Sequence, residues 1–118
     1  MSRLARIAPE LPVADLRRSV EYYRDRLGFQ NVMTTPGEDY AVMERDDVAV
    51  HLFQDGTGRH TAGSIHIFTG GLDELLAELQ SRGAQVKQGI VRQPWGNRDF
   101  RVQDDSGNEL KFTEPLDE

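Results

Sequence analysis

The stretch Asp15-Leu-Arg-Arg-Ser-Val-Glu-Tyr-Tyr-Arg-Asp-Arg-Leu-Gly28 carries the pattern from which a fold prediction for this chain starts. Apolar residues recur in it at the spacing of one helix face: Leu16, Val20, Tyr23 and Leu27. Asp15 is a favourable N-terminal cap, and Gly28 can adopt the left-handed conformation that ends a helix. The stretch therefore predicts an amphipathic helix over residues 16–27.

Strand patterns lie on both sides of this helix. They cover residues 4–13, 29–35, 39–45 and 48–54. Pro9 and Pro12 place the first of them at a sheet edge, because proline cannot donate to a central ladder. Pro36-Gly37 and Asp46-Asp47 separate the later strands and are typical of turns. This half of the chain therefore reads as strand, helix and three strands.

The second half repeats that order after a linker-like segment at 55–63. The expected elements are a strand at 64–69, a helix from Leu72 that stops at Gly83, and strands at 84–92, 98–104 and 109–114. We therefore predict an α+β fold of two tandem βαβββ modules that form a cupped mixed sheet and pair in a dimer. The whole chain, 1–118, would be one domain, with modules at about 1–58 and 62–115.

Alternation along the strands predicts which side chains face the helices. Leu110 and Phe112 share one face of the last strand, and Ile65 and Ile67 share one face of the strand after the linker. The opposite faces carry mixed polar and aromatic residues: Ser64, His66, Phe68, Glu109, Lys111 and Thr113. A sheet with helices on one side and such a surface on the other favours a concave binding site.

Composition narrows the classes of function. The 118 residues contain 14 Lys+Arg against 20 Asp+Glu, giving a formal net charge of -6, and no cysteine. The absence of cysteine excludes disulfides, cysteine-ligated metals and thiol nucleophiles. The acidic balance argues against nucleic acid as a partner and, if charge selects a ligand, favours a cation. With no long apolar run and no signal-like N-terminus, we expect a cytoplasmic protein without a membrane partner.

Few residues in this sequence suggest catalysis. It contains no phosphate loop, nucleophile elbow or dinucleotide fingerprint. His51 and His66 lie on strand patterns and could bind a metal with a carboxylate, or could be ordinary hydrogen-bonded residues. Trp95, held between proline and glycine, could be a stacking platform or could fill the end of the core. Both pairs of alternatives stay open at this point.

Several segments resemble the vicinal oxygen chelate superfamily, which includes glyoxalases, extradiol dioxygenases and bleomycin-resistance proteins. The superfamily's first helix is similar to Val13-Ala-Asp-Leu16 followed by Tyr22-Tyr-Arg-Asp-Arg-Leu-Gly-Phe29, and its last turn to Asp105-Ser-Gly-Asn108. Three further segments most resemble the bleomycin-resistance proteins: Arg45-Asp-Asp-Val48, Gly71-Leu-Asp-Glu-Leu75 and Gln93-Pro-Trp-Gly96 ending in Phe100. The resemblance covers about residues 4 to 115.

The metal-ligand positions that the resemblance implies are mostly replaced here. They fall on Ala8, His51, Ser64 and Lys111, of which only His51 could bind a metal. The resemblance therefore implies no cofactor and favours a binding protein over an enzyme. A shifted metal site would use Glu10, His51 and His66.

By this resemblance, the protein would be a cytoplasmic homodimer that sequesters a planar, cationic glycopeptide antibiotic of the bleomycin class and so confers resistance. Its two stacking positions fall on Tyr40 and Trp95. The ligand-binding residues would be Tyr40, Trp95, His66, Glu109, Phe68 and Lys111. The alternatives are a metal-dependent lyase, transferase or dioxygenase with the shifted ligand set, and a binding protein for another small ligand.

Overall fold

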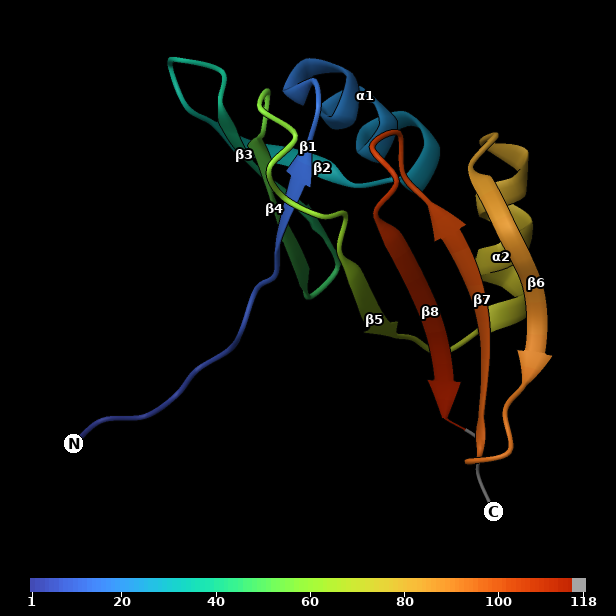
Figure 1. Cartoon of the computed structure of the whole chain (residues 1–118). Helices are drawn as coiled ribbons and strands as arrows, with labels where there is room; N and C mark the ends of the chain where they lie inside the picture. Colours follow the sequence, from blue (N-terminus) through green and yellow to red (C-terminus); the bar gives the residue numbers. More distant parts are fainter. Residues whose placement is uncertain (116–118) are drawn as a thin grey trace.

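The computed structural model describes residues 1–115, and Figure 1 shows two successive βαβββ modules. The first module contains β1 (Glu10–Val13), α1 (Leu16–Leu27), β2 (Gln30–Thr34), β3 (Tyr40–Arg45) and β4 (Val48–Gln54). The second contains β5 (Ser64–Phe68), α2 (Leu72–Ser81), β6 (Gln85–Arg92), β7 (Asn97–Gln103) and β8 (Glu109–Pro115). The predicted α+β class and the order of elements are confirmed.

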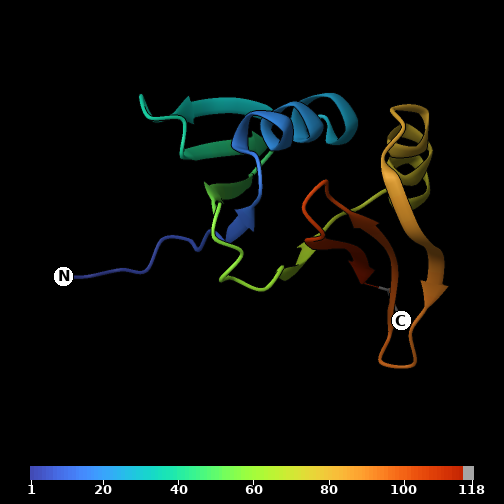
Figure 2. The same cartoon turned by 45° about the horizontal axis from the view of Figure 1, so that its top comes forward.

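Each module forms its own four-stranded sheet. The strand orders are β1-β4-β3-β2 and β5-β8-β7-β6, so the two modules share one topology. In each sheet the first strand pairs in parallel with the last, and the other pairs are antiparallel. Helix α1 packs on the first sheet and α2 on the second, which leaves one face of each sheet open (Figure 2).

Helix α1 begins and ends where the sequence predicts. The Asp15 side chain accepts a hydrogen bond from the backbone N–H of Arg18, and Gly28 adopts a φ of 75° in the left-handed region. Leu16, Tyr23 and Leu27 are buried, as the helical spacing requires. A side chain at position 28 would be strained by that φ and would also meet the Arg45 guanidinium.

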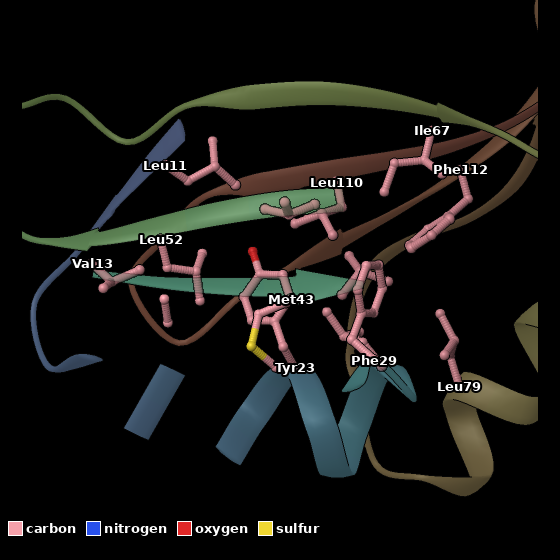
Figure 3. Close-up of a cluster of buried hydrophobic side chains, with 14 of the residues drawn as sticks. Leu11, Val13, Tyr23, Phe29, Met43, Leu52, Ile67, Leu79, Leu110 and Phe112 are labelled. Atoms are coloured by element: carbon pink, nitrogen blue, oxygen red, sulfur yellow. The ribbon is translucent and has the colours of Figure 1, made fainter. Parts of the chain in front are cut away.

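The buried core runs through both modules, as Figure 3 shows for side chains from α1, β3, β4 and β8. Tyr23 is fully buried, and its hydroxyl donates to Asp104 Oδ2 at 2.8 Å in the β7–β8 turn. Burial, with the nearby Asp104 charge, raises the pKa of Tyr23 well above its usual value. Ser19 donates to Asp105 in the same turn at 2.8 Å. The first helix therefore ties the two modules of one chain together.

The first strand is shorter than predicted. We expected a strand over residues 4–13, but β1 covers only Glu10–Val13, and the chain before it extends away from the body (Figures 1 and 2). Leu4 and Ile7 are 100% and 93% exposed. Pro9 has no N–H to donate, and the ladder with β4 begins one residue after it. Strand formation at 4–9 would require a partner that one chain does not supply.

Membrane-spanning character is absent from the helices of the described region. Neither α1 nor α2 is long and apolar enough to cross a bilayer.

Candidate ligand-binding faces

The open face of the first sheet carries a cluster of Glu10, Tyr40 and His51. The Tyr40 hydroxyl donates to Glu10 Oε2 at 2.6 Å and lies 2.6 Å from His51 Nδ1. A phenol has one proton, so with that proton on the Glu10 bond the second bond requires a hydrogen on His51 Nδ1. Glu10 and His51 are direct partners across β1 and β4. The Tyr40 hydroxyl is therefore hydrogen-bonded by side chains from two neighbouring strands, β1 and β4.

These bonds also fix the ionisation and orientation of the Tyr40 ring. The hydrogen bond to Glu10, with smaller effects of burial and of the Glu10 charge, raises the pKa of Tyr40 to about 12. Its ring meets the His51 ring edge-on, with centroids 5.6 Å apart and planes at 86°. The Tyr40 side chain is therefore neutral and fixed in orientation by its hydrogen bonds, and part of its ring is exposed to solvent.

The open face of the second sheet is arranged in cross-strand rows. His66 pairs with Lys111 across β5 and β8, and Lys111 pairs with Arg101 across β8 and β7. His66 Nδ1 lies 3.1 Å from Thr113 Oγ1, and its ring stacks on Phe68 with centroids 6.1 Å apart. The predicted alternation is confirmed for Leu110 and Phe112, which are buried on the helix side, whereas Thr113, predicted on the open face, is buried as well.

Charged side chains fill the centre of this face. Glu109 accepts a hydrogen bond from Ser64 at 3.2 Å, and its Oε1 lies 3.6 Å from Lys111 Nζ and 3.8 Å from Arg101 Nη1. Arg101 Nε lies 3.9 Å from the buried carboxylate of Asp99. Our sequence prediction missed Arg101 and Asp99. The alternation around buried Phe100 and Val102 in the strand predicted at 98–104 was the signal that could have found them.

Trp95 lies in the loop between β6 and β7 and is 67% exposed. This exposure excludes the alternative in which it fills the end of the core of its own chain. The loop that carries it and strand β3, which begins at Tyr40, lie at opposite ends of the molecule (Figures 1 and 2). One chain therefore does not bring the two predicted stacking residues together.

The three residues of the shifted metal site are also divided between the sheets. Glu10 and His51 lie together on the first sheet, whereas His66 lies on the second and is bonded to Thr113. Within residues 1–115 of one chain, no three histidine, aspartate or glutamate side chains are grouped so that they could hold a metal ion. Of the predicted set, only Glu10 and His51 are neighbours.

A cleft of about 460 Å³ lies between the modules and is lined partly by the β3–β4 turn and the segment that leads into α2. Arg45 crosses the boundary and forms a two-pronged ion pair with Glu78, with nitrogen–oxygen distances of 2.7 and 3.0 Å. Of the six predicted ligand-binding residues, only Phe68 lines this cleft. The other five predicted residues lie on the open sheet faces or in the β6–β7 loop.

Comparisons with known families agree with this architecture. Residues 3–112 match the family described as the Glyoxalase/Bleomycin resistance protein/Dioxygenase superfamily, and the chain belongs to it. A curated bleomycin resistance protein of Geobacillus stearothermophilus is 28% identical, over 92% of this chain and 95% of the relative. A bleomycin resistance protein of Staphylococcus aureus matches at the same identity and coverage.

Solved structures share the fold. TioX from Micromonospora sp. ML1 superposes with a TM-score of 0.83 at 24% identity, covering 95% of this chain and 99% of that one. The bleomycin-binding protein of Streptomyces verticillus, solved in complex with copper(II)-bleomycin, gives a TM-score of 0.81 at 22% identity over the full length of both chains. These structures show that the fold is shared, and the similarity to bleomycin resistance proteins rests on the sequence relatives at 28% identity.

Proposed function

We propose that this protein binds and sequesters a planar, cationic antibiotic of the bleomycin class and confers resistance without transforming the drug. The observation that carries the proposal is the exposed indole of Trp95, presented on a hairpin loop in a chain that matches bleomycin resistance proteins along nearly its whole length. A tryptophan side chain has only two χ angles, so it supplies a large contact area to a flat ligand at a small cost in conformational entropy.

A homodimer would complete the site. Strand β3, which begins at Tyr40, and the β6–β7 loop, which carries Trp95, lie at opposite ends of the molecule (Figure 1). A drug held between both rings would therefore require Tyr40 from one chain and the partner's Trp95. Residues 1–9 extend away from the folded part of their own chain. Leu4 and Ile7 are therefore exposed, and a second copy of the chain would cover them. Large apolar side chains exposed in this way are typical of contact surfaces.

Stacking and charge would contribute separately. Each aromatic pair in the sandwich would add about 0.5–1.5 kcal/mol beyond the burial of its area. The net charge of -6 per chain would steer a cationic drug toward the protein and make the association rate depend on salt. His66, Glu109, Phe68 and Lys111 would line the same pocket from the second sheet.

A fluorescence titration tests this function directly, because Trp95 is the only tryptophan. Metal-free bleomycin is added at low and at high salt, and the indole emission is followed. We expect saturable quenching at one drug per subunit, with weaker binding at high salt. Unchanged emission across the micromolar range would remove bleomycin as the ligand and leave the fold and family standing.

A further inference from the structure

The second sheet places two cations against each other on its open face. Arg101 of β7 and Lys111 of β8 are direct cross-strand partners, and His66 of β5 is the next partner in the same row. Like charges directly opposite one another destabilise a sheet. Arg92 and Arg98 face each other in the same way elsewhere in this sheet, so a like-charge pair alone does not mark a site. The row of Arg101 and Lys111 is a candidate site because it lies on the open face, next to residues already predicted to bind ligand.

The side-chain donors of Arg101 and Lys111 have no acceptor at hydrogen-bond distance within residues 1–115. The carboxylate oxygens nearest to Arg101 lie 3.8 and 3.9 Å away, and the one nearest to Lys111 lies 3.6 Å away, all beyond hydrogen-bond reach. Arg101 Nε is buried in this region without a partner. The Arg101 and Lys111 side chains are 29% and 22% exposed, and of their nitrogen atoms only Arg101 Nε is shielded from water. Such donors favour a ligand that brings its own acceptors.

The two neighbouring carboxylates accept hydrogen bonds from neutral side chains rather than from Arg101 or Lys111. Asp99 accepts from the Gln88 side-chain amide at 3.1 Å and from the Gln93 amide at 3.2 Å. Glu109 accepts from the Ser64 hydroxyl. Asp99 and Glu109 therefore balance the two positive charges within ion-pair distance, without a hydrogen bond to either cation.

Arg98 on the same strand shows what a structural arginine looks like in this fold. It faces the helix side, where its Nη2 lies 2.6 Å from Glu114 and 3.0 Å from Asp73. Arg98 thus has two carboxylate acceptors at hydrogen-bond distance, whereas Arg101, three residues further along, has none among the described residues. The difference separates an arginine that joins α2 to the sheet from one that is available to a ligand.

An aromatic surface borders the cation row. The rings of His66 and Phe68 stack with an angle of 19° between their planes, and Phe68 is 64% exposed. We propose that this face binds an aromatic oxyacid, with the ring on Phe68 and His66 and the carboxylate, sulfonate or phosphate group on Arg101 and Lys111. An oxyanion matches the fork of an arginine and forms strong, charge-assisted hydrogen bonds.

This inference rests on the proposed function in taking His66, Phe68 and Lys111 as part of the ligand site, and it adds an acidic group to the ligand that the site selects. The chain as a whole carries a charge of -6, which disfavours free anions at long range. Recognition of the acid therefore has to come from direct contacts, and a bare anion without a ring should bind poorly.

Three probes with one ring system test the proposal by isothermal titration calorimetry. They are 2-naphthoate, its neutral amide 2-naphthamide, and 2-naphthylmethylammonium. On the wild-type protein we expect 2-naphthoate to bind at least tenfold more tightly than either of the others. Equal affinities for 2-naphthoate and 2-naphthamide would overturn the proposed acid site, and inorganic phosphate binding as tightly as 2-naphthoate would overturn the role of the ring.

Matched variants assign the effect to residues. We expect Arg101→Gln and Lys111→Gln each to lower the affinity for 2-naphthoate by about tenfold to a hundredfold, as charge-assisted hydrogen bonds would, and to leave that for 2-naphthamide unchanged. Arg92→Gln is the control, because Arg92 pairs with Arg98 away from this row and its loss changes the net charge equally. An equal loss in Arg92→Gln would show that only overall charge matters, and would contradict the proposal. Thermal unfolding of each variant checks its fold.

Bleomycin, titrated on the same wild-type protein, separates this inference from the proposed function. Binding of 2-naphthoate without any effect of bleomycin on Trp95 emission would leave the acid site standing and remove the bleomycin role. Binding of bleomycin, together with equal affinities for 2-naphthoate and 2-naphthamide, would keep the bleomycin role and remove the acid site.

Discussion

The two open sheet faces of this protein differ in how their polar groups are satisfied. On the first sheet, the Tyr40 hydroxyl has two partners at 2.6 Å, Glu10 and His51. On the second, Arg101 and Lys111 are held beside carboxylates at 3.6–3.9 Å and form no side-chain hydrogen bond with the rest of residues 1–115. The modules share a topology, so the contrast comes from side chains alone.

The contrast indicates which kind of interaction each sheet face can make with a ligand. A ring whose polar end is already bonded offers a flat, preorganised surface, and little conformational entropy is lost when a ligand stacks on it. A half-buried cation without hydrogen bonds offers donors that a ligand can satisfy. The first face is therefore suited to stacking and the second to polar recognition, and a ligand that used both would need two chains.

The largest effect is expected at Trp95. Trp95→Ala should lower drug affinity by about thirtyfold to a thousandfold, since a tryptophan at the centre of an interface commonly carries about 2–4 kcal/mol. Thermal unfolding should not change, because the side chain is exposed in its own chain. Calorimetry measures the binding. Val32→Ala, an exposed apolar position on β2, is the control and should bind normally. Loss of the folded dimer in Trp95→Ala would mean that the indole is structural.

A smaller effect is expected when the hydrogen bond between Tyr40 and Glu10 on the first sheet is removed. Glu10→Ala removes the acceptor and the charge that raise the pKa of Tyr40, so that pKa should fall from about 12 toward the ordinary value of about 10. Drug affinity should fall by about threefold to tenfold, as the loss of one ordering hydrogen bond implies. NMR of labelled tyrosine rings follows the titration, and Glu44→Gln is the control on β3. An unchanged Tyr40 pKa in Glu10→Ala would show that the hydrogen bond does not form in solution.

The two arginines of β7 give a comparison of stability. Glu114→Gln removes a carboxylate partner of Arg98, and the Arg98 hydrogen bond holds the pKa of Glu114 below its usual range. A depressed pKa stabilises the fold above the unfolded value of about 4.3 and loses that effect as the pH falls through the folded value. Glu114→Gln should therefore lower the urea midpoint at pH 7, and the difference from wild type should disappear as the pH falls below the lowered pKa of Glu114.

Arg101→Gln should behave differently in the same urea experiment. Because Arg101 makes no hydrogen bond within the described region and only lies within ion-pair distance of Asp99 and Glu109, its loss should lower the free energy of unfolding by less than Glu114→Gln does. A destabilisation as large as that of Glu114→Gln would make Arg101 a structural residue, and the contrast between the two sides of the sheet would be lost.

The smallest effect concerns long-range charge. Raising the salt concentration from about 0.01 to 0.1 M shortens the Debye length from about 30 to 10 Å. The association rate of a cationic drug should then fall severalfold, while its dissociation rate stays nearly constant, because steering acts before contact. Stopped-flow fluorescence measures both rates. An association rate that does not depend on salt would show that the acidic charge plays no part in capture.

The elements that local sequence determines were the ones that could be predicted. Asp15, Gly28 and the apolar spacing between them define α1, and alternation in the last strand separates buried Leu110 from open Lys111. Asp46 and Asp47 form the predicted turn between β3 and β4, where Asp46 adopts a φ of 51°. Each of these features depends on contacts within a few residues along the chain.

What could not be predicted depends on contacts between distant segments. The prediction of a strand at 4–9 failed because strand formation needs a neighbour, and one chain offers none there. Arg101 was missed because a charged residue on a strand is usually solvated, and only the register with Lys111 shows that two cations face each other. The separation of Tyr40 from Trp95 follows from how the modules are joined, which no local pattern contains.

A mixed-dimer experiment tests most directly whether two chains build the site. Tyr40→Ala and Trp95→Ala chains carry different affinity tags, and the mixed dimer is purified and titrated with bleomycin by calorimetry. Each variant alone should bind the drug weakly, whereas the mixed dimer should regain one site of wild-type affinity, because Tyr40 of one chain meets the partner's Trp95. A mixed dimer that binds as weakly as its parents would contradict a site shared between subunits.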